Sequence, residues 1–177
     1  MMLAGPYLVA CFLLVAAGAA KAARPSDTAR ALHDLVPAVP PAVAPVAVRV
    51  LACAEAVLGA AALVVPIRAV AAAVGASYFV FSVVVAYARR RGGPLASCGC
   101  FGTPDTPATR LHLVVDLGLA ASAAVVAATL RQGAALAELS GQPLHGVPLV
   151  LSAVVGAAVV IVALGPAARL GAIRTRA

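Results

Sequence analysis

The sequence predicts an all-α membrane protein: a polytopic helix bundle with a four-helix core and a fifth helix near the C-terminus. Three observations predict it. Of the 177 residues 63% are hydrophobic and only 11% are charged, and the mean hydropathy is +1.05. A soluble domain is about half apolar and a quarter charged. The apolar residues also form long blocks of Ala, Val and Leu without an amphipathic period, which is typical of membrane-spanning helices.

The first apolar block, residues 3–20, contains no charged residue and is followed by Lys21. At about 1.5 Å per residue it is long enough to span the bilayer. A cleaved signal peptide is the alternative, but a positively charged segment before the block is missing. Thr28–Val36 then mixes apolar with charged residues and predicts a short amphipathic helix at the interface. Pro37–Pro45 contains four prolines and predicts a rigid connector.

Three further apolar blocks follow the first and predict three more spans. These blocks are residues 46–65, 69–88 and 111–130. The first two of them are separated by only Pro66-Ile67-Arg68, so we expect them to be antiparallel neighbours. We expect residues 133–177 to form a connector, a fifth span at 147–164 and a basic tail.

Four ionisable residues lie in or beside the predicted spans and form a candidate polar site within the membrane. They are Lys21, Arg49, Glu55 and Asp116. Such groups normally face the bundle interior or water, because contact with lipid is costly. Glu55 could carry a proton or anchor a ligand; alternatively, it forms an interhelical ion pair with Lys21 or Arg49. Gly59, one turn from Glu55, would let another helix approach closely.

The loop between the third and fourth predicted spans contains a CxC motif, Cys98 and Cys100, preceded by three arginines and followed by Arg110. Positive neighbours favour the reactive thiolate form of cysteine. A disulfide across so small a ring should be strained and therefore comparatively oxidising. Gly99 and Gly102 supply the backbone freedom that such a ring needs. We therefore predict that Cys98 and Cys100 interconvert between dithiol and disulfide.

Two alternatives for this motif stay open. Two thiolates could bind Cu(I) with His112 as a further ligand, although no second cysteine pair or dense histidine cluster accompanies them, and we predict no metal site. The motif could also simply build a tight turn.

His112 and Asp116 are four residues apart and share one face of the fourth predicted span. His112 could therefore act as a general base or proton relay for the thiols, with Asp116 orienting its imidazole. The alternative is electrostatics at the helix end, with Asp116 paired to Arg110 or Lys21.

The basic residues beside the predicted spans are distributed unequally between the two sides of the membrane. One side has Lys21, Arg24, Arg30, Arg89, Arg90, Arg91, Arg110, Arg169, Arg174 and Arg176, and the other has Arg68 and Arg131. Cytoplasmic loops carry an excess of Lys and Arg. With five spans in the cell membrane, this count predicts an outside N-terminus and a cytoplasmic cysteine loop.

The net charge of +7 and the pI near 10.1 are explained by the same span-end residues, which also attract anionic lipid headgroups. No basic stripe with interleaved aromatic residues is present and Trp is absent, so nucleic acid is not an expected partner. The expected partners are the lipid bilayer and a protein that exchanges thiols and disulfides with the chain.

Several of these features together resemble the MauE methylamine-utilisation family, within the wider DoxX-like membrane proteins. They are Gly18 and Lys21 at the end of the first span, Glu55 and Gly59, the arginine-rich end of the third span, the string Cys98-Gly99-Cys100-Phe101-Gly102 and the acidic Asp116. The resemblance covers residues 1–132. It implies a DoxX-like four-helix core and a link to methylamine metabolism, through disulfide formation during maturation of a disulfide-rich dehydrogenase subunit.

The favoured interpretation is thus a membrane thiol–disulfide redox protein that supports protein maturation. A quinone is the electron acceptor we consider, although no residue pattern identifies its site. The alternative is a noncatalytic scaffold or a small-solute permeation subunit, in which Glu55, Arg49 and Asp116 line a polar cavity. Maturation of an exported partner would suit an outward-facing cysteine loop, whereas the arginine count places the loop inside. No nucleotide-binding glycine pattern, hydrolase triad or metalloprotease helix is visible.

Overall fold

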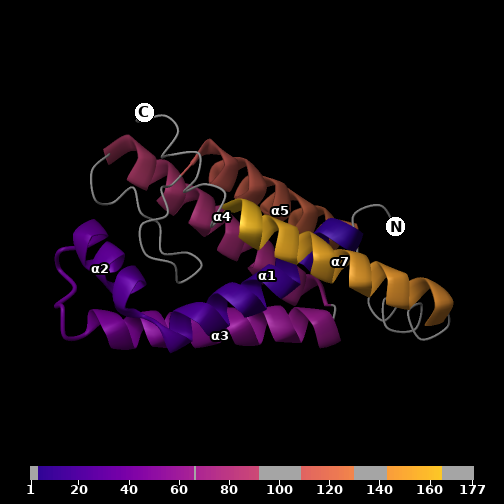
Figure 1. Ribbon diagram of the computed structural model, residues 1–177, viewed down its shortest axis with the longest axis horizontal. Coiled ribbons are helices and arrows are strands. Elements are labelled where there is room, and N and C mark those ends of the chain that lie inside the picture. The colour runs from indigo at the N-terminus through magenta and orange to yellow at the C-terminus, as the bar shows by residue number, and fades with distance from the viewer. Residues whose placement is uncertain (1–3, 66, 92–108, 130–142, 165–177) are drawn as a thin grey trace.

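The computed structural model describes residues 4–65, 67–91, 109–129 and 143–164, and every regular element among them is a helix (Figure 1). In chain order these are α1 (Ala4–Ala23), α2 (Ser26–Leu35), α3 (Ala44–Val64), α4 (Arg68–Arg91), α5 (Arg110–Thr129) and α7 (Pro143–Leu164). The predicted all-α class is confirmed. Each predicted span overlaps one of these helices, with ends that differ by about one turn or less.

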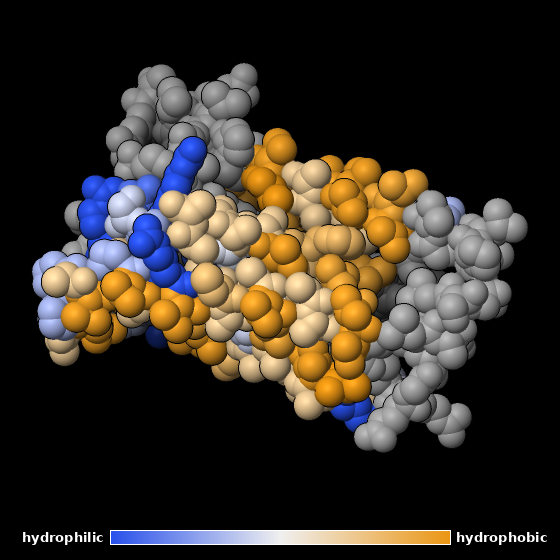
Figure 2. Space-filling model, turned by 90° about the horizontal axis from the view of Figure 1, so that it is seen from below, coloured by the Kyte–Doolittle hydropathy of each residue, from blue (hydrophilic) through white to orange (hydrophobic). Residues whose placement is uncertain are grey.

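Four of the described helices, α1, α3, α4 and α5, are long and apolar enough to cross a membrane. The apolar part of α7, Val150–Leu164, is shorter, so its crossing of the bilayer stays a prediction. Many large apolar side chains on these helices are exposed, including Val57, Val80 and Val114. In Figure 2 hydrophilic residues gather mainly at the end of the molecule that holds α2, and hydrophobic residues cover most of the remainder of this face. This distribution fits helices surrounded by lipid.

The long helices alternate in direction along the bundle. In Figure 1 α1, α4 and α7 run one way, and α3 and α5 run the other. The last residues of α1 and α4 and the first residues of α3 and α5 therefore lie at one end of the bundle, together with α2. Lys21, Arg90 and Arg110 belong to these helix ends, whereas Arg68 starts α4 at the opposite end. Which side of the membrane each end faces stays a prediction.

The bundle consists of two closely packed helix pairs, α1 with α3 and α4 with α5. Helix α1 also contacts α5 and α7, so it lies at the centre of the bundle. Its buried face contributes Tyr7, Cys11 and Leu14 to the main hydrophobic core, where they meet residues of α4 such as Val74. Helices α3 and α4, which follow each other in the chain, do contact one another, but less extensively than either contacts its pair partner.

Two glycines allow the backbones of α1 and α3 to approach closely. A Cβ atom on Gly18 would lie 2.6 Å from the carbonyl oxygen of Ala52, and one on Gly59 would lie 2.8 Å from that of Cys11. Both distances are shorter than a side chain tolerates, and in each case the obstacle is backbone. The prediction that Gly59 admits a neighbouring helix is therefore confirmed, and that helix is α1.

The short helix α2 packs on the first turns of α3. Ala29 on α2 is buried together with Ala44 and Val48, and this cluster turns the apolar face of α2 toward α3. The connector between the two helices is closed by His33, whose Nδ1 lies 2.8 Å from the carbonyl oxygen of Val39. The predicted amphipathic helix is thus present.

We expect Gly59→Ala to destabilise the bundle by about 1–3 kcal/mol, the usual cost of overpacking a close contact. Gly118→Ala is the matched control, because a Cβ on Gly118 would meet nothing within 4 Å. Denaturant unfolding of both variants in detergent micelles measures the difference. Equal stability of the two variants would contradict the close approach of α1 and α3.

Candidate functional site

The centre of the candidate site is an ion pair between Lys21 on α1 and Glu55 on α3. Lys21 Nζ donates a hydrogen bond to Glu55 Oε2, and both side chains are buried, with only 7% and 5% of each residue exposed. Lys21 lies in the last turn of α1, whereas Glu55 lies near the middle of α3. Of the two partners that the sequence allowed for Glu55, the structure selects Lys21.

Two aromatic residues of α4 complete the surroundings of the Lys21 ammonium group. Its Nζ lies 4.8 Å from the ring centroid of Phe81, a cation–π contact. Phe81 meets Tyr78 edge to face, with centroids 5.7 Å apart. The Tyr78 hydroxyl donates a 2.7 Å hydrogen bond to the carbonyl oxygen of Ala10 on α1. The ion pair and its aromatic neighbours therefore connect α1, α3 and α4.

Asp116 on α5 faces the same ammonium group across a small cavity. The cavity has a volume of about 30 Å³, and its polar lining comes from Lys21, Asp116 and Tyr78. Apolar residues of α1, α4, α5 and α7 form the remaining wall. Asp116 is half-buried and interacts electrostatically with Lys21, but it makes no hydrogen bond or close ion pair with any described residue. A second carboxyl group thus lies beside an ammonium group that Glu55 already binds.

His112 and Thr109 cap the start of α5. The backbone N–H of His112 donates to Thr109 Oγ1 at 3.4 Å, and the backbone N–H of Thr109 donates to His112 Nδ1 at 3.3 Å. Thr109 Oγ1 also lies 2.8 Å from Nδ1. This reciprocal pattern is that of a capping box, with histidine in the position usually held by Glu or Gln.

The capping box determines the state of the imidazole. Because a backbone N–H only donates, Nδ1 accepts, and the proton of the neutral ring is on Nε2. The imidazole also hydrogen bonds to the backbone of Leu164, the last residue of α7. His112 is therefore buried, with one partner directly before α5 and one at the end of α7.

Two expectations for these residues need correction. Arg49 does not belong to the polar cluster: it is exposed near the start of α3, where a long side chain can extend along apolar surface toward water. Asp116 does not orient His112, because Thr109 holds the imidazole instead. The shared helix face of His112 and Asp116 could not reveal this, because the residue directly before a helix can also bind a side chain of its first turn.

Two residues of the site, Thr109 and Phe81, had no role in the sequence interpretation. Thr109 with His112 follows the spacing of a capping box, which a search restricted to Glu and Gln misses. Tyr78 and Phe81 are three residues apart and so share one face of α4, but nothing in the sequence pairs that face with Lys21.

The predicted redox residues Cys98, Cys100, Gly99 and Gly102 lie outside the described residues. Helices α4 and α5, between which they occur in the chain, are described on both sides of them. Among the described residues, no three His, Cys, Asp or Glu side chains are close enough to hold a metal ion.

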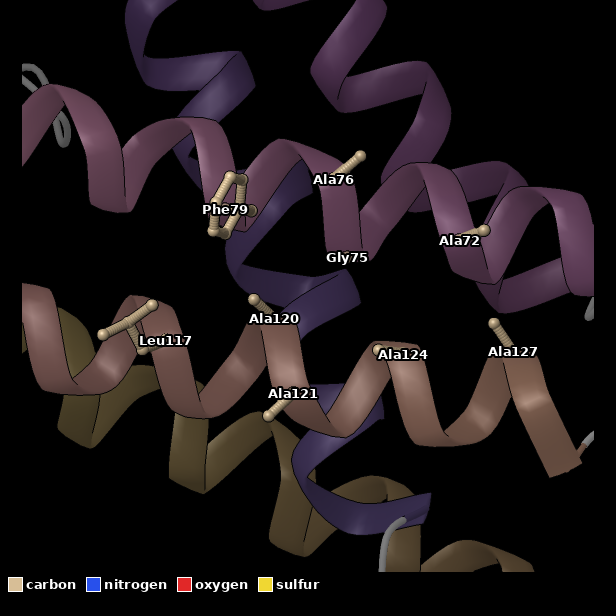
Figure 3. A pocket seen from close by; sticks show the side chains of 9 residues that line it. All are labelled: Ala72, Gly75, Ala76, Phe79, Leu117, Ala120, Ala121, Ala124 and Ala127. Carbon is tan, nitrogen blue, oxygen red and sulfur yellow. The ribbon is translucent and has the colours of Figure 1, made fainter.

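A separate apolar groove lies between α4 and α5, as Figure 3 shows. Its volume is about 580 Å³ and it is open to the surroundings of the bundle. The lining is mostly alanine, with Gly75 on α4 at its floor and Phe79 and Leu117 toward one end. Small side chains leave this space between two otherwise closely packed helices, and its lining suits a hydrocarbon chain.

The helices and the enclosed charges define a multi-pass α-helical membrane protein with an ion pair buried inside its bundle. The sequence model of the family described as "Methylamine utilisation protein MauE" matches residues 1–130, which include α1 to α5 and the CxC motif. The chain therefore belongs to the MauE family, as its sequence features suggested. Comparison with curated proteins found no match, and neither did comparison with solved structures.

We expect Lys21→Met to destabilise the protein by about 3–5 kcal/mol, because it leaves the Glu55 carboxylate buried without its partner. The double variant Lys21→Met/Glu55→Leu should recover most of that loss, since it removes both charges. The control is Asp27→Asn, which breaks the surface pair with Arg30 and should cost roughly 0.5 kcal/mol. Unfolding of the wild-type protein, Lys21→Met, Glu55→Leu and the double variant in micelles gives the coupling energy. Additive single effects would contradict a buried pair.

We expect His112→Ala to destabilise α5 by about 1 kcal/mol through loss of the cap. His112→Gln should lose less, because glutamine at this position can close the same capping box. Hydrogen exchange of the first backbone amides of α5 measures the effect locally. Equal exchange in the two variants would show that the capping box does not hold this helix end.

Proposed function

We propose that this MauE-family protein is a membrane thiol–disulfide redox protein, which supports disulfide formation in a partner protein during methylamine utilisation. The observation that carries the proposal is the pair Cys98 and Cys100, one glycine apart, within the part of the chain that matches the family. The family description supplies the metabolic context, and the thiol chemistry follows from the motif.

Close packing of the helices before and after the cysteines supports this role. A Cβ on Gly75 of α4 would be only 3.4–3.5 Å from atoms of Ala120 and Ala123 on α5, which is ordinary van der Waals contact. The end of α4 and the start of α5 lie at the same end of the bundle (Figure 1). The described helix ends there carry Arg90 and Arg110, and positive charge favours thiolates.

The proposed reaction has two steps. First, the thiols of Cys98 and Cys100 lose two protons and two electrons to an acceptor, and a bond forms between their sulfur atoms. A thiolate of the partner protein then attacks this disulfide, and a second partner thiol resolves the mixed disulfide. The partner leaves with a disulfide, and Cys98 and Cys100 return to the dithiol form.

We propose an isoprenoid quinone as the electron acceptor, since its reduction to quinol takes up two electrons and two protons. The apolar groove between α4 and α5 supports this choice, because an isoprenoid chain fits an alanine-lined space of about 580 Å³. The groove lies between the two helices that connect to the cysteine loop (Figure 3).

Sidedness is part of the proposal. We propose that the cysteine loop lies on the cytoplasmic side of the cell membrane, and the unequal distribution of Lys and Arg supports this. A proton relay through His112 would have to replace the hydrogen bonds that Nδ1, the ring nitrogen that could accept a proton, already accepts from Thr109.

The decisive experiment traps the thiols of the lipid-reconstituted protein by alkylation, before and after a quinone is added. The wild-type protein and Cys53→Ala, the matched control on the exposed face of α3, should convert from dithiol to disulfide. Cys98→Ser/Cys100→Ser should not, and it should lose the ability to oxidise a reduced partner. Ala124→Phe, which fills the groove, should slow oxidation at least tenfold relative to Ala128→Phe, which lies outside the groove lining.

Three results would count against the proposal. Thiols that stay reduced with quinone would reject the acceptor, and thiols that also stay reduced with a chemical oxidant would reject the redox pair. Full biological activity without both sulfurs would favour a noncatalytic scaffold.

His112→Gln should leave the oxidation rate and its pH profile unchanged if histidine only caps α5. A membrane-impermeant maleimide added to intact cells should fail to label the loop, because we place it inside.

A further inference from the structure

The buried polar cluster contains one more acidic group than basic groups. Lys21 from α1 is the basic group, and Glu55 from α3 and Asp116 from α5 are the acidic ones. Among the neutral titratable side chains, Tyr78 on α4 lines the same cavity, and His112 lies one turn from Asp116 on α5. Tyr7 and Cys11 are also buried on α1, but ten or more residues from Lys21. The described part of α7 that packs here, Val150–Leu164, has no titratable residue. With both carboxyls ionised, the interior would carry a net negative charge.

Such a charge is unfavourable inside an apolar bundle. An isolated buried charge loses its hydration, and proteins avoid this cost by pairing the group or by neutralising it. Glu55 is paired with Lys21 by a direct hydrogen bond. Asp116 has neither a hydrogen bond nor a close ion pair among the described residues, and the Lys21 ammonium group is already held between Glu55 and the Phe81 ring. Protonation of Asp116 would remove this cost.

The cavity between Asp116 and Lys21 has space for water. A volume of about 30 Å³ accommodates about two water molecules at roughly 15 Å³ each. Lys21, Asp116 and Tyr78 provide polar atoms in its wall, which a water molecule needs as partners. The cavity is too small for an organic solute, which argues against a permeation path through this part of the bundle.

We propose that this cavity is a proton-binding site in which Asp116 carries the proton, and water in the cavity connects its carboxyl group to Lys21. Asp116 is six residues from the start of α5, about 9 Å along the helix axis at about 1.5 Å per residue. The bound proton can therefore exchange with water at the nearby end of the bundle. The Lys21–Glu55 pair keeps its charge and its helix contacts when Asp116 gains or loses its proton.

Infrared difference spectroscopy of the lipid-reconstituted protein tests this assignment, because a protonated carboxyl group has a carbonyl stretch separate from the carboxylate bands. At neutral pH the wild-type protein should show this band, which should disappear when the pH is raised. Asp116→Asn should lack the band. Glu55→Gln removes the excess acidic group, so Asp116 should ionise as the partner of Lys21 and this variant should also lack the band. The surface control Asp27→Asn should keep it. Asp116→Glu should shift the band to a new frequency, which identifies the residue even if the asparagine variant folds poorly.

Three outcomes would overturn the inference. The wild-type protein would show no such band if Asp116 were ionised and a cation occupied the cavity. The band would persist in Asp116→Asn if Glu55 carried the proton. A band that did not respond to pH would show that the group does not exchange its proton. The inference does not depend on the thiols, so Cys98→Ser/Cys100→Ser must keep the band whether or not it loses redox activity.

Discussion

The structure depends on enclosing one ion pair, Lys21 with Glu55, inside helices that otherwise present apolar side chains to lipid. A charged group in hydrocarbon is unfavourable by several kcal/mol, and pairing offsets this cost only when the two groups meet with good geometry and stay shielded. The short side chain of Glu55 can reach Lys21 only if α1 and α3 approach closely. Gly18 and Gly59 permit that approach, because any Cβ at either position would collide with backbone of the other helix. Burial of the Lys21–Glu55 pair therefore depends on the two glycines.

The same requirement explains why α1 lies at the centre of the bundle. Its ammonium group needs a carboxylate from α3 on one side and an aromatic face from α4 on the other, and the cavity lined by α5 and α7 lies beside it. Tyr78 adds a hydrogen bond from α4 to the backbone of α1, so α4 contacts α1 through this bond as well as through the cation–π contact of Phe81. In lipid, where the hydrophobic effect does not drive helices together, such polar contacts and close packing must provide the association.

Much of this fold could be predicted because long apolar blocks determine spans almost independently of their neighbours. Glu55 and Gly59 could be assigned to a helix contact for the same local reason. The partner of Glu55 could not be chosen between Lys21 and Arg49, since the choice depends on which face of α3 meets α1. Chain proximity also favoured α3 with α4, whereas the most extensive contacts join α1 with α3 and α4 with α5. The geometry of a helix start caused the error at His112: Thr109, not Asp116, binds the imidazole.

His112 also shows how a segment outside the family match becomes part of the bundle. The MauE match ends at residue 130, yet the imidazole hydrogen bonds to the backbone of Leu164 at the end of α7, and Val160 and Leu164 line the cavity that contains Asp116. Without α7 that wall would open toward lipid, and the carboxyl group would lose its enclosure. It follows that the C-terminal helix helps to determine the chemistry of Asp116, although the groups that carry that chemistry all come from the family core.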